Sequence, residues 1–268
     1  MVNLPTRTVL AALAVASFPA VAAAPQPVAR LDLPLQFVPA LSDEFEGATL
    51  DAAKWDPDMP DWGRWSWEPG NVSVAGGSLH MTMRFAPHER GAAKLDYQSG
   101  AVRSRGTPLL HGYMEARIKA ARRFPGVSTA FWAFRNTPSL WTEIDVVETT
   151  QHWKDPQVAY FNTHVMRAPT LDGGEPLHEK RMHDIGADPA QNFHVYSCLW
   201  TRSELVWFVD GREVARRANE HWHQPLDIVL SLGLRPPLDR AGSPAGFPAT
   251  AQVDYVRVWS LAVPPTAR

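Results

Sequence analysis

The amino-acid sequence predicts an all-β fold, an antiparallel sandwich. Short runs in which apolar and polar residues alternate recur along the chain, and turn-forming residues separate them. One Asp-Gly pair stands between two such runs, which is the strongest short-range sequence signal for a β-hairpin. The long apolar periodicity of a helix is missing from the sequence, so we expect strands to supply the core.

The predicted strands follow one another at short intervals. In chain order the alternating segments are residues 79–85, 113–119, 205–209, 212–215, 226–234 and 253–259, with Asp210-Gly211 as the predicted hairpin turn. Glycine, serine and proline residues separate the strands at 75–78, 104–108 and 235–237. Cys198 is the only cysteine and lies in an apolar, strand-like run, so we expect it to be a buried core residue.

The sequence divides into four segments. Residues 1–24 combine one basic residue, Arg7, with a short apolar stretch and a cleavage-like run of small residues, which is typical of a secretory signal peptide. Pro19 interrupts the apolar stretch, which is too short for a transmembrane helix. Residues 25–40 form a proline-rich lead-in, 41–260 one β-rich domain and 261–268 a short tail. We therefore expect a secreted protein, extracellular or periplasmic.

Composition and charge argue against several classes of partner. The chain has 268 residues, of which 45% are hydrophobic and 20% charged, values typical of a soluble globular protein. Lys and Arg number 26 against 28 for Asp and Glu, so the formal charge is −2. This balance is unlike the broad basic face that nucleic acid or anionic lipid requires. We expect no nucleic-acid partner, no membrane partner and a monomeric protein.

Three acidic residues stand close together in a segment rich in β-branched residues: Glu143, Asp145 and Glu148. On a regular strand Glu143 and Asp145 would share one face, and Glu148 would point to the other. One extra residue, a β-bulge at Val146-Val147, would return Glu148 to the face of the first two acids. Because bulges re-aim side chains beside active sites, we predict one here.

Three carboxyl groups on one face would repel one another, which separates their pKa values and leaves one group protonated while another is ionised. Cleavage of a glycosidic bond uses such a pair: one carboxylate attacks the anomeric carbon, and one carboxylic acid protonates the leaving oxygen. Direct attack places the two carboxyls about 5–5.5 Å apart and retains the anomeric configuration. A solvent-facing acidic strand or a calcium site would use the same residue types, and the spacing alone leaves these alternatives open.

The segment Glu143-Ile144-Asp145-Val146-Val147-Glu148 resembles the E-x-D-x-x-E active-site strand of the family-16 glycoside hydrolases. The likeness extends from Leu41 to Trp259, with the family's motifs in the same order. These motifs are SDEF (42–45), LDAAKW (50–55), NVSV (71–74), GSL (77–79), YQSG (97–100), HGYMEAR (111–117), AFW (130–132), FHVY (193–196), WFVDG (207–211) and VDYVRV (253–258). The resemblance implies a concanavalin-like β-sandwich jelly roll of two curved antiparallel sheets, with a substrate cleft across the concave face. It also makes residues 41–260 a catalytic domain with a retaining, endo-acting mechanism.

The resemblance further implies roles for individual residues. Glu143 would be the nucleophile and Glu148 the general acid/base, and Asp145 between them would hold the nucleophile's geometry and help set the proton distribution. His164 matches a family histidine that reaches the cleft near the reacting sugar; without the resemblance it is equally well a hydrogen-bonded strand histidine. No cofactor is implied for catalysis. Family members often hold a structural calcium ion on the convex side, which Gly77 and Asp254 would match.

Aromatic and cationic residues supply candidates for substrate binding. The chain has 11 tryptophans, and sugar rings stack on indole faces. We predict Trp65, Trp132 and Trp141 as stacking platforms, with core packing as the alternative for each; Trp65 and Trp141 lie in polar, turn-like sequence. Arg64 is a candidate substrate-binding cation, with a solvated surface position as its alternative.

The acid segment also bears on which polysaccharide is bound. Laminarin- and lichenan-type family members usually have Gly before this strand and Met or Phe inside it, whereas this chain has Trp141-Thr142 before it and Val146-Val147 inside. This pattern looks closer to agarase, porphyranase and carrageenase relatives, which act on red-algal galactans. Sulfated galactans require cations, for which the candidates are Arg64, Arg103, Arg135 and Arg235. We predict a galactan substrate; the alternatives are a β-1,3- or mixed-linkage glucan and a non-catalytic carbohydrate-binding sandwich.

Overall fold

The computed structural model describes residues 24–61, 63–149, 157–167, 176–236 and 242–262. Within these ranges the regular structure is seventeen β-strands and two short 3₁₀ turns, η1 (Pro39–Leu41) and η2 (Pro69–Asn71). No helix in the described part of the chain has the length and apolar character to cross a membrane. The predicted signal peptide, apart from Ala24, and the predicted tail beyond residue 262 lie outside the described residues and stay predictions.

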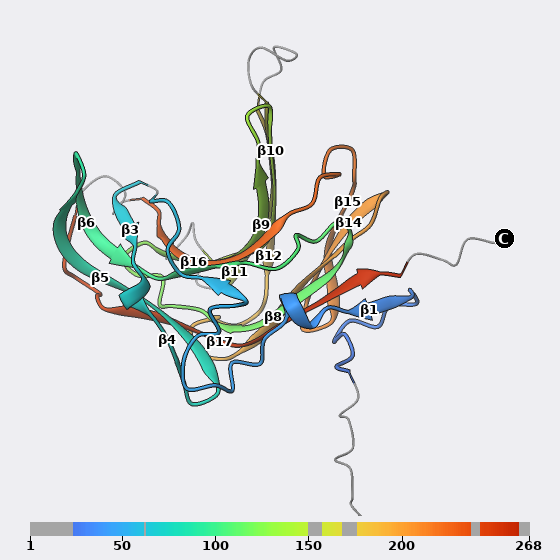
Figure 1. Ribbon diagram of the computed structural model, residues 1–268, viewed down its shortest axis with the longest axis horizontal. Coiled ribbons are helices and arrows are strands. Elements are labelled where there is room, and N and C mark those ends of the chain that lie inside the picture. The colour runs from blue at the N-terminus through green and yellow to red at the C-terminus, as the bar shows by residue number, and fades with distance from the viewer. Residues whose placement is uncertain (1–23, 62, 150–156, 168–175, 237–241, 263–268) are drawn as a thin grey trace, which may run out of the picture.

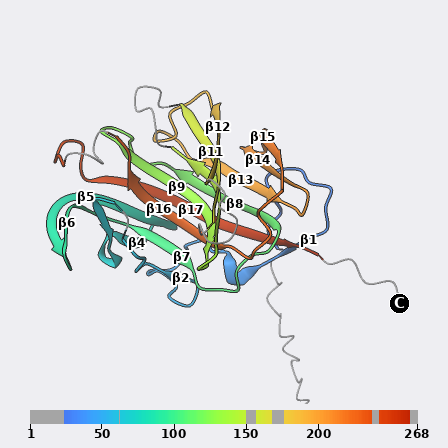
Figure 2. The same cartoon turned by 90° about the horizontal axis from the view of Figure 1, so that it is seen from above.

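The strands form two sheets, so the predicted all-β sandwich is confirmed (Figure 1). The larger sheet has the order β15 (Arg212–Ala218), β14 (Glu204–Val209), β13 (His194–Trp200), β8 (Gly112–Lys119), β17 (Ala249–Leu261), β5 (Ser78–Arg90), β6 (Ala93–Ser99) and β3 (Trp65–Trp67), with β1 (Leu35–Phe37) paired to β17 and β4 (Val72–Ala75) to β5. The smaller sheet has the order β12 (Leu177–Asp184), β11 (Val158–Arg167), β10 (Leu140–Glu148), β9 (Val127–Asn136), β16 (Asp227–Leu234), β7 (Ala101–Ser104) and β2 (Trp55–Asp56). The long β5–β6 hairpin curls at the end of the molecule opposite β1 (Figure 2).

One strand pairing departs from the antiparallel prediction. β3 runs parallel to β6, with Trp65 opposite Tyr97 and Trp67 opposite Ser99. Every other pairing between described strands is antiparallel. From the sequence, Trp65 was expected in turn-like surroundings. The strand was not recognised because three residues are too few to show an alternation of apolar and polar side chains.

The Asp210-Gly211 pair forms the predicted hairpin turn between β14 and β15. Both residues have positive φ, 49° for Asp210 and 76° for Gly211, as a two-residue turn matched to the twist of the strands requires. A Cβ at residue 211 would also lie 3.0 Å from the carbonyl oxygen of Val28, so glycine is required there twice over. The hairpin matters for the site described below because β14 carries Trp207.

The core lies between the two sheets. It is built from buried aliphatic and aromatic side chains of both, such as Ile144 and Leu230 from the smaller sheet and Trp207 and Val256 from the larger. Cys198 is fully buried among them, as predicted. Since Ile144 faces this core, Glu143 and Asp145 on either side of it point to the opposite face of the smaller sheet.

Candidate active site

The predicted β-bulge is present in β10, at Val146. The regular strand β9 pairs with β10 through Phe134↔Glu143, Trp132↔Asp145, Phe131↔Val147 and Ala130↔Glu148. The register shifts between Asp145 and Val147, so Val146 is the extra residue. Ala130, Trp132 and Phe134 are alternate residues of β9 and therefore point to one face of the sheet. Their partners on β10 point to the same face. Glu143, Asp145 and Glu148 therefore project from the same face of the smaller sheet.

This acidic face opens into a cavity of about 380 Å³, which we call the acid cavity. Besides the three acids it is lined by Trp65, Trp67, Ser128, Ala130, Trp132, His164, Met166, His178, Ser231, Gly233 and Arg235. These residues come from strands of both sheets and from the segment after β16. The bulge thus brings all three predicted catalytic acids to one concave pocket.

Two indole groups hold the backbone of the acid strand from the side of the larger sheet. The Trp222 indole N–H donates to the carbonyl oxygen of Glu143 at 2.8 Å, and the Trp207 indole N–H donates to the carbonyl oxygen of Asp145 at 2.9 Å. Both tryptophans are buried. They fix the strand directly beneath the acids, and no sequence signal indicated this role because the partners lie 79 and 62 residues away.

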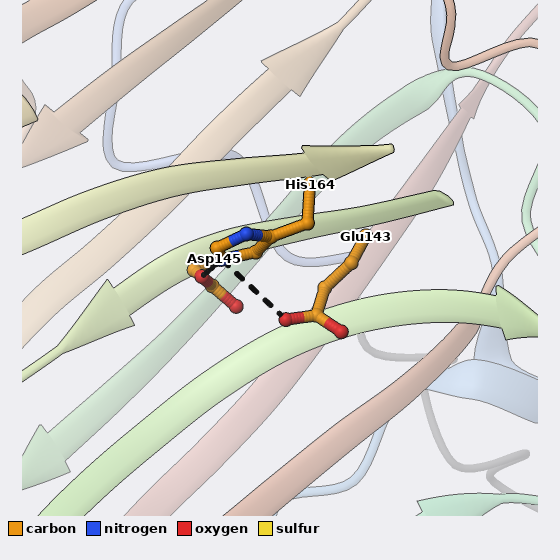
Figure 3. Close-up of side chains that lie close together, drawn as sticks. All are labelled: Glu143, Asp145 and His164. Carbon is orange, nitrogen blue, oxygen red and sulfur yellow. Dashed lines mark hydrogen bonds and ion pairs between the residues drawn. The ribbon is translucent and has the colours of Figure 1, made fainter. Parts of the chain in front are cut away.

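His164 and the first two acids point toward one another (Figure 3). The His164 Nε2 atom lies 3.2 Å from Asp145 Oδ2 and 3.8 Å from Glu143 Oε1, and its Nδ1 atom lies 2.6 Å from Nδ1 of His178. Burial lowers the pKa of His164, but the bond to Asp145 and the charges of Asp145, Glu143 and Glu148 outweigh it and raise the pKa overall. The ring therefore supplies positive charge to the carboxyl cluster.

Glu148 is buried between two donors. Its Oε2 atom accepts a hydrogen bond of 2.6 Å from the Asn162 side-chain amide, and its Oε1 atom forms an ion pair with Arg235. Burial and the charge of Asp145 raise the pKa of Glu148, while Arg235 and His164 oppose that rise. Asn162 was missed by the sequence reasoning, although it stands two residues before His164 and so shares its strand face.

The carboxyl cluster around Glu143 keeps one proton to an unusually high pH. Burial, followed by the charge of Asp145, raises the pKa of Glu143 to about 8, against the effects of His164 and of the Trp141 indole N–H, which donates to Oε2 at 2.9 Å. Three carboxylates with a protonated His164 and Arg235 carry a net charge of −1, so one shared proton makes the cluster neutral. Such a proton belongs to the coupled group rather than to one residue.

Glu143→Gln is expected to stabilise the protein more strongly as the pH rises. With the pKa of Glu143 raised to about 8, the folded carboxyl cluster retains a proton that an unfolded glutamate, with the ordinary value of 4.5, releases at lower pH. Between these values rising pH therefore favours the unfolded state, and glutamine removes this penalty. Thermal unfolding at pH 5 and pH 9 should give a difference in Tm between variant and wild type that grows with pH. A difference that stays constant or shrinks would contradict the buried-carboxyl interpretation.

The structure separates the predicted substrate-binding residues into two groups. Trp65 and Trp132 line the acid cavity but are buried, with 5% and 7% of each residue exposed, and Trp141 lines an adjoining cavity. Arg64 lines neither of these two cavities. Its guanidinium forms an ion pair with Asp96 instead, from the turn that precedes β3. The structure therefore does not bring Arg64 to the acids.

The metal predictions find no support in the side-chain contacts. Asp254 accepts a hydrogen bond of 2.7 Å from Arg117, so a calcium ion at Gly77 and Asp254 would have to displace this cation. In the described ranges the one close group of three possible ligand side chains is Glu143, Asp145 and His164. This donor set is poor for calcium, which takes six to eight oxygen ligands. Structural calcium, and catalysis without a cofactor, stay predictions.

In comparisons with known proteins, the matching family model and the similar proteins are named as enzymes that act on polysaccharides. Residues 35–261 match a family model described as "Beta-porphyranase A-D, GH16 domain". A κ-carrageenase of Pseudoalteromonas carrageenovora is 34% identical over 81% of this chain and 63% of its own length. A β-glucanase of Acetivibrio thermocellus is 28% identical over 81% of this chain and 62% of its own length, and β-porphyranase B of Zobellia galactanivorans is 28% identical over 82% and 83%. This chain thus spans less than two thirds of the first two relatives.

A solved structure agrees with these relatives. The crystal structure of the Pseudoalteromonas carrageenovora κ-carrageenase with an oligotetrasaccharide of κ-carrageenan superimposes with a TM-score of 0.79 and 31% sequence identity. The match covers 87% of this chain and 98% of that one. The predicted jelly-roll sandwich is therefore the fold of this chain.

Proposed function

The chain belongs to glycoside hydrolase family 16, and from that premise we propose that it is a retaining endo-glycosidase that cleaves a β-linked red-algal galactan by double displacement. The observation that carries the proposal is the bulge at Val146, which turns Glu148 to the face of Glu143. A carboxylate and a carboxylic acid on one face of a cavity can reach the two sides of one sugar linkage.

The proposed reaction has two steps. In the first, ionised Glu143 attacks the anomeric carbon and Glu148 donates its proton to the leaving oxygen, so that the glycosidic bond breaks and a glycosyl ester forms on Glu143. In the second, Glu148 takes a proton from water, and the water oxygen displaces Glu143 from the anomeric carbon. The assignment of the two roles rests on the family resemblance. The bond from Trp141 to Glu143 and the bond from Asn162 to Glu148 would keep both carboxyls aimed into the cavity.

Asp145 and His164 would assist catalysis through their charges, which shift the pKa values of Glu143 and Glu148. Asp145 is 3% exposed and hydrogen-bonds His164, so its charge acts on Glu143 and Glu148 with little screening by water. It raises the pKa of both glutamates, which keeps one proton available near neutral pH. The positive charge of His164 offsets Asp145 and prevents repulsion from driving the acids apart.

A galactan substrate is supported by the relatives and by the cations near the acids. A κ-carrageenase and a β-porphyranase are among the relatives, and Arg235 lines the acid cavity. The β-glucanase relative keeps a β-1,3- or mixed-linkage glucan as the second candidate substrate. We further propose that the mature protein is exported, acts as a monomer and binds neither nucleic acid nor membranes. A non-catalytic sandwich is the weaker alternative, because pure binding has no use for three carboxyls that line one cavity.

The experiment is a substrate panel. Release of new reducing ends is measured with agarose, porphyran, κ-carrageenan, laminarin and lichenan, for the wild type and for Glu143→Ala. We expect the wild type to release ends from at least one galactan, with a rapid fall in polymer length, and the variant to release none. Activity on laminarin or lichenan alone would overturn the galactan assignment and leave the mechanism standing. No activity on any polysaccharide would overturn both.

A further inference from the structure

Three polar side chains stand in a row across strands β10, β11 and β12. Glu143 lies opposite His164 in the pairing of β10 with β11, and His164 lies opposite His178 in the pairing of β11 with β12. Side chains directly opposite one another point to the same face of a sheet, so the row runs along the acidic face of the smaller sheet. His178 ends this row and lines the acid cavity. No pattern in the sequence indicated a role for it.

One proton lies between the two histidine rings. The Nδ1 atom of His164 is 2.6 Å from the Nδ1 atom of His178. At this distance one nitrogen must donate an N–H and the other must accept it with its lone pair, because two N–H groups or two lone pairs would repel each other. The accepting ring is therefore neutral, and the pair carries at most one positive charge.

The surrounding charges place this proton on His164. The other nitrogen of that ring, Nε2, lies 3.2 Å from Asp145 Oδ2 and 3.8 Å from Glu143 Oε1, so the ring faces two carboxyl groups. Among the described residues no carboxylate lies within 4 Å of a nitrogen of His178, which is exposed. A positive ring is stabilised by opposite charges nearby, and of the two rings only His164 has them. A doubly protonated His164 thus donates to a neutral His178.

We propose that His178 is a positioning residue for the reaction: its neutral Nδ1 accepts the Nδ1–H of His164 and keeps the Nε2–H of that ring aimed at Asp145. An imidazole ring can turn over about its bond to Cβ, which would put a carbon atom in the place of Nε2. The bond to His178 prevents this turn, because a ring carbon is no substitute for the Nδ1–H donor. The proposal rests on the proposed function, in which Glu143 leaves the sugar as a carboxylate and the positive charge of His164, 3.8 Å away, stabilises it.

Substitutions of His178 separate the accepting atom from the bulk of the side chain. His178→Leu has no acceptor and should lower kcat about tenfold, the value of one hydrogen bond to a charged group, while KM changes less than about twofold. His178→Asn places a carbonyl oxygen near the position of Nδ1 and should recover most of this loss. Because His178 is exposed, neither substitution opens a cavity in the core. The matched control is His183→Leu, five residues further along β12 on its other face, which should behave as wild type.

The experiment combines heteronuclear NMR of the imidazole nitrogens with steady-state kinetics on the preferred polysaccharide. In the wild type, without substrate, we expect a nitrogen–nitrogen coupling between the two Nδ1 atoms, with the proton attached to the nitrogen of His164. His178→Leu and His178→Asn should both lose the coupling, and the signal that remains in each variant assigns the donor to His164. The kinetics give kcat and KM for the wild type, for these two variants and for His183→Leu.

A proton attached to His178, or no coupling between the rings, would overturn the proposal. An equal fall of kcat in His178→Leu and His178→Asn would also overturn it, because the bulk of the ring and not its accepting atom would then matter. A raised KM with an unchanged kcat would do the same, since it indicates a substrate contact.

These outcomes differ from failure of the proposed function. If the wild type cleaves a polysaccharide and His178→Leu keeps its full kcat, the positioning role alone is lost. If the wild type cleaves no polysaccharide, the proposed function is lost, and the coupling, which is measured without substrate, still tests where the proton lies.

Discussion

Glu143→Ala is expected to lower kcat on the preferred polysaccharide by about 10⁴-fold or more, the scale of loss seen when a nucleophile is removed. The methyl group cannot form the glycosyl ester, so the double displacement has no first intermediate. The predicted stacking residues Trp65 and Trp132, which line the cavity, are unchanged in this variant, so the Kd for oligosaccharide should change little. Initial rates and calorimetric binding on the same preparation measure the two effects.

Azide distinguishes loss of a nucleophile from general damage to the site. In Glu143→Ala a small anion can enter the space of the carboxylate and attack the anomeric carbon once, which inverts its configuration. With an activated aryl β-glycoside we therefore expect azide to restore turnover and give the α-glycosyl azide. Glu89→Ala, at an exposed glutamate of β5, is the matched control and should behave as wild type. A β-glycosyl azide from Glu143→Ala would assign the nucleophile to another residue.

Glu148→Ala should lower kcat by about 10²- to 10⁴-fold on polysaccharide, the usual contribution of a general acid. The loss should be much smaller for an aryl glycoside, because a good leaving group departs without protonation. In the wild type burial and the charge of Asp145 raise the pKa of Glu148, so kcat/KM should fall on the alkaline side as this acid loses its proton. Glu148→Ala should lose this alkaline fall, since no proton donor is left to titrate.

The azide product again identifies the role. In Glu148→Ala the glycosyl ester on Glu143 still forms from an activated substrate, and azide then displaces Glu143, so two inversions give the β-glycosyl azide. An equal loss of activity on polysaccharide and on aryl glycoside would contradict the general-acid role. Asn162→Ala is a useful companion: it removes the donor that holds Glu148 Oε2 at 2.6 Å and should shift the alkaline limb without abolishing activity.

Much of the fold is encoded locally. The alternation at 79–85, 113–119 and 253–259 corresponds to β5, β8 and β17, and Asp210-Gly211 forms its turn with the two positive φ values that this pair favours. β3 was not foreseen, because its three residues depend on pairing with β6 rather than on a pattern of their own. Short edge strands are set by tertiary contacts, which a local pattern does not contain.

The site was predictable where strand periodicity determines it. The bulge at Val146 followed from the spacing of the three acids, because only an extra residue brings Glu148 to the face of Glu143. The donors that hold the acids were not predictable in the same way. Trp207, Trp222 and Arg235 reach them from distant parts of the chain. Arg64 was misplaced because its ion-pair partner, Asp96, lies 32 residues away and no local pattern indicates it.

The stereochemistry of the first product tests the central claim most directly. Proton NMR of a fresh digest of the preferred oligosaccharide, recorded before mutarotation, resolves the anomeric proton of the new reducing end. Two carboxyls acting from one strand face through a glycosyl ester predict that the β-anomer appears first and the α-anomer grows in later. If the α-anomer appears first, water attacks the sugar directly and Glu143 is not the nucleophile.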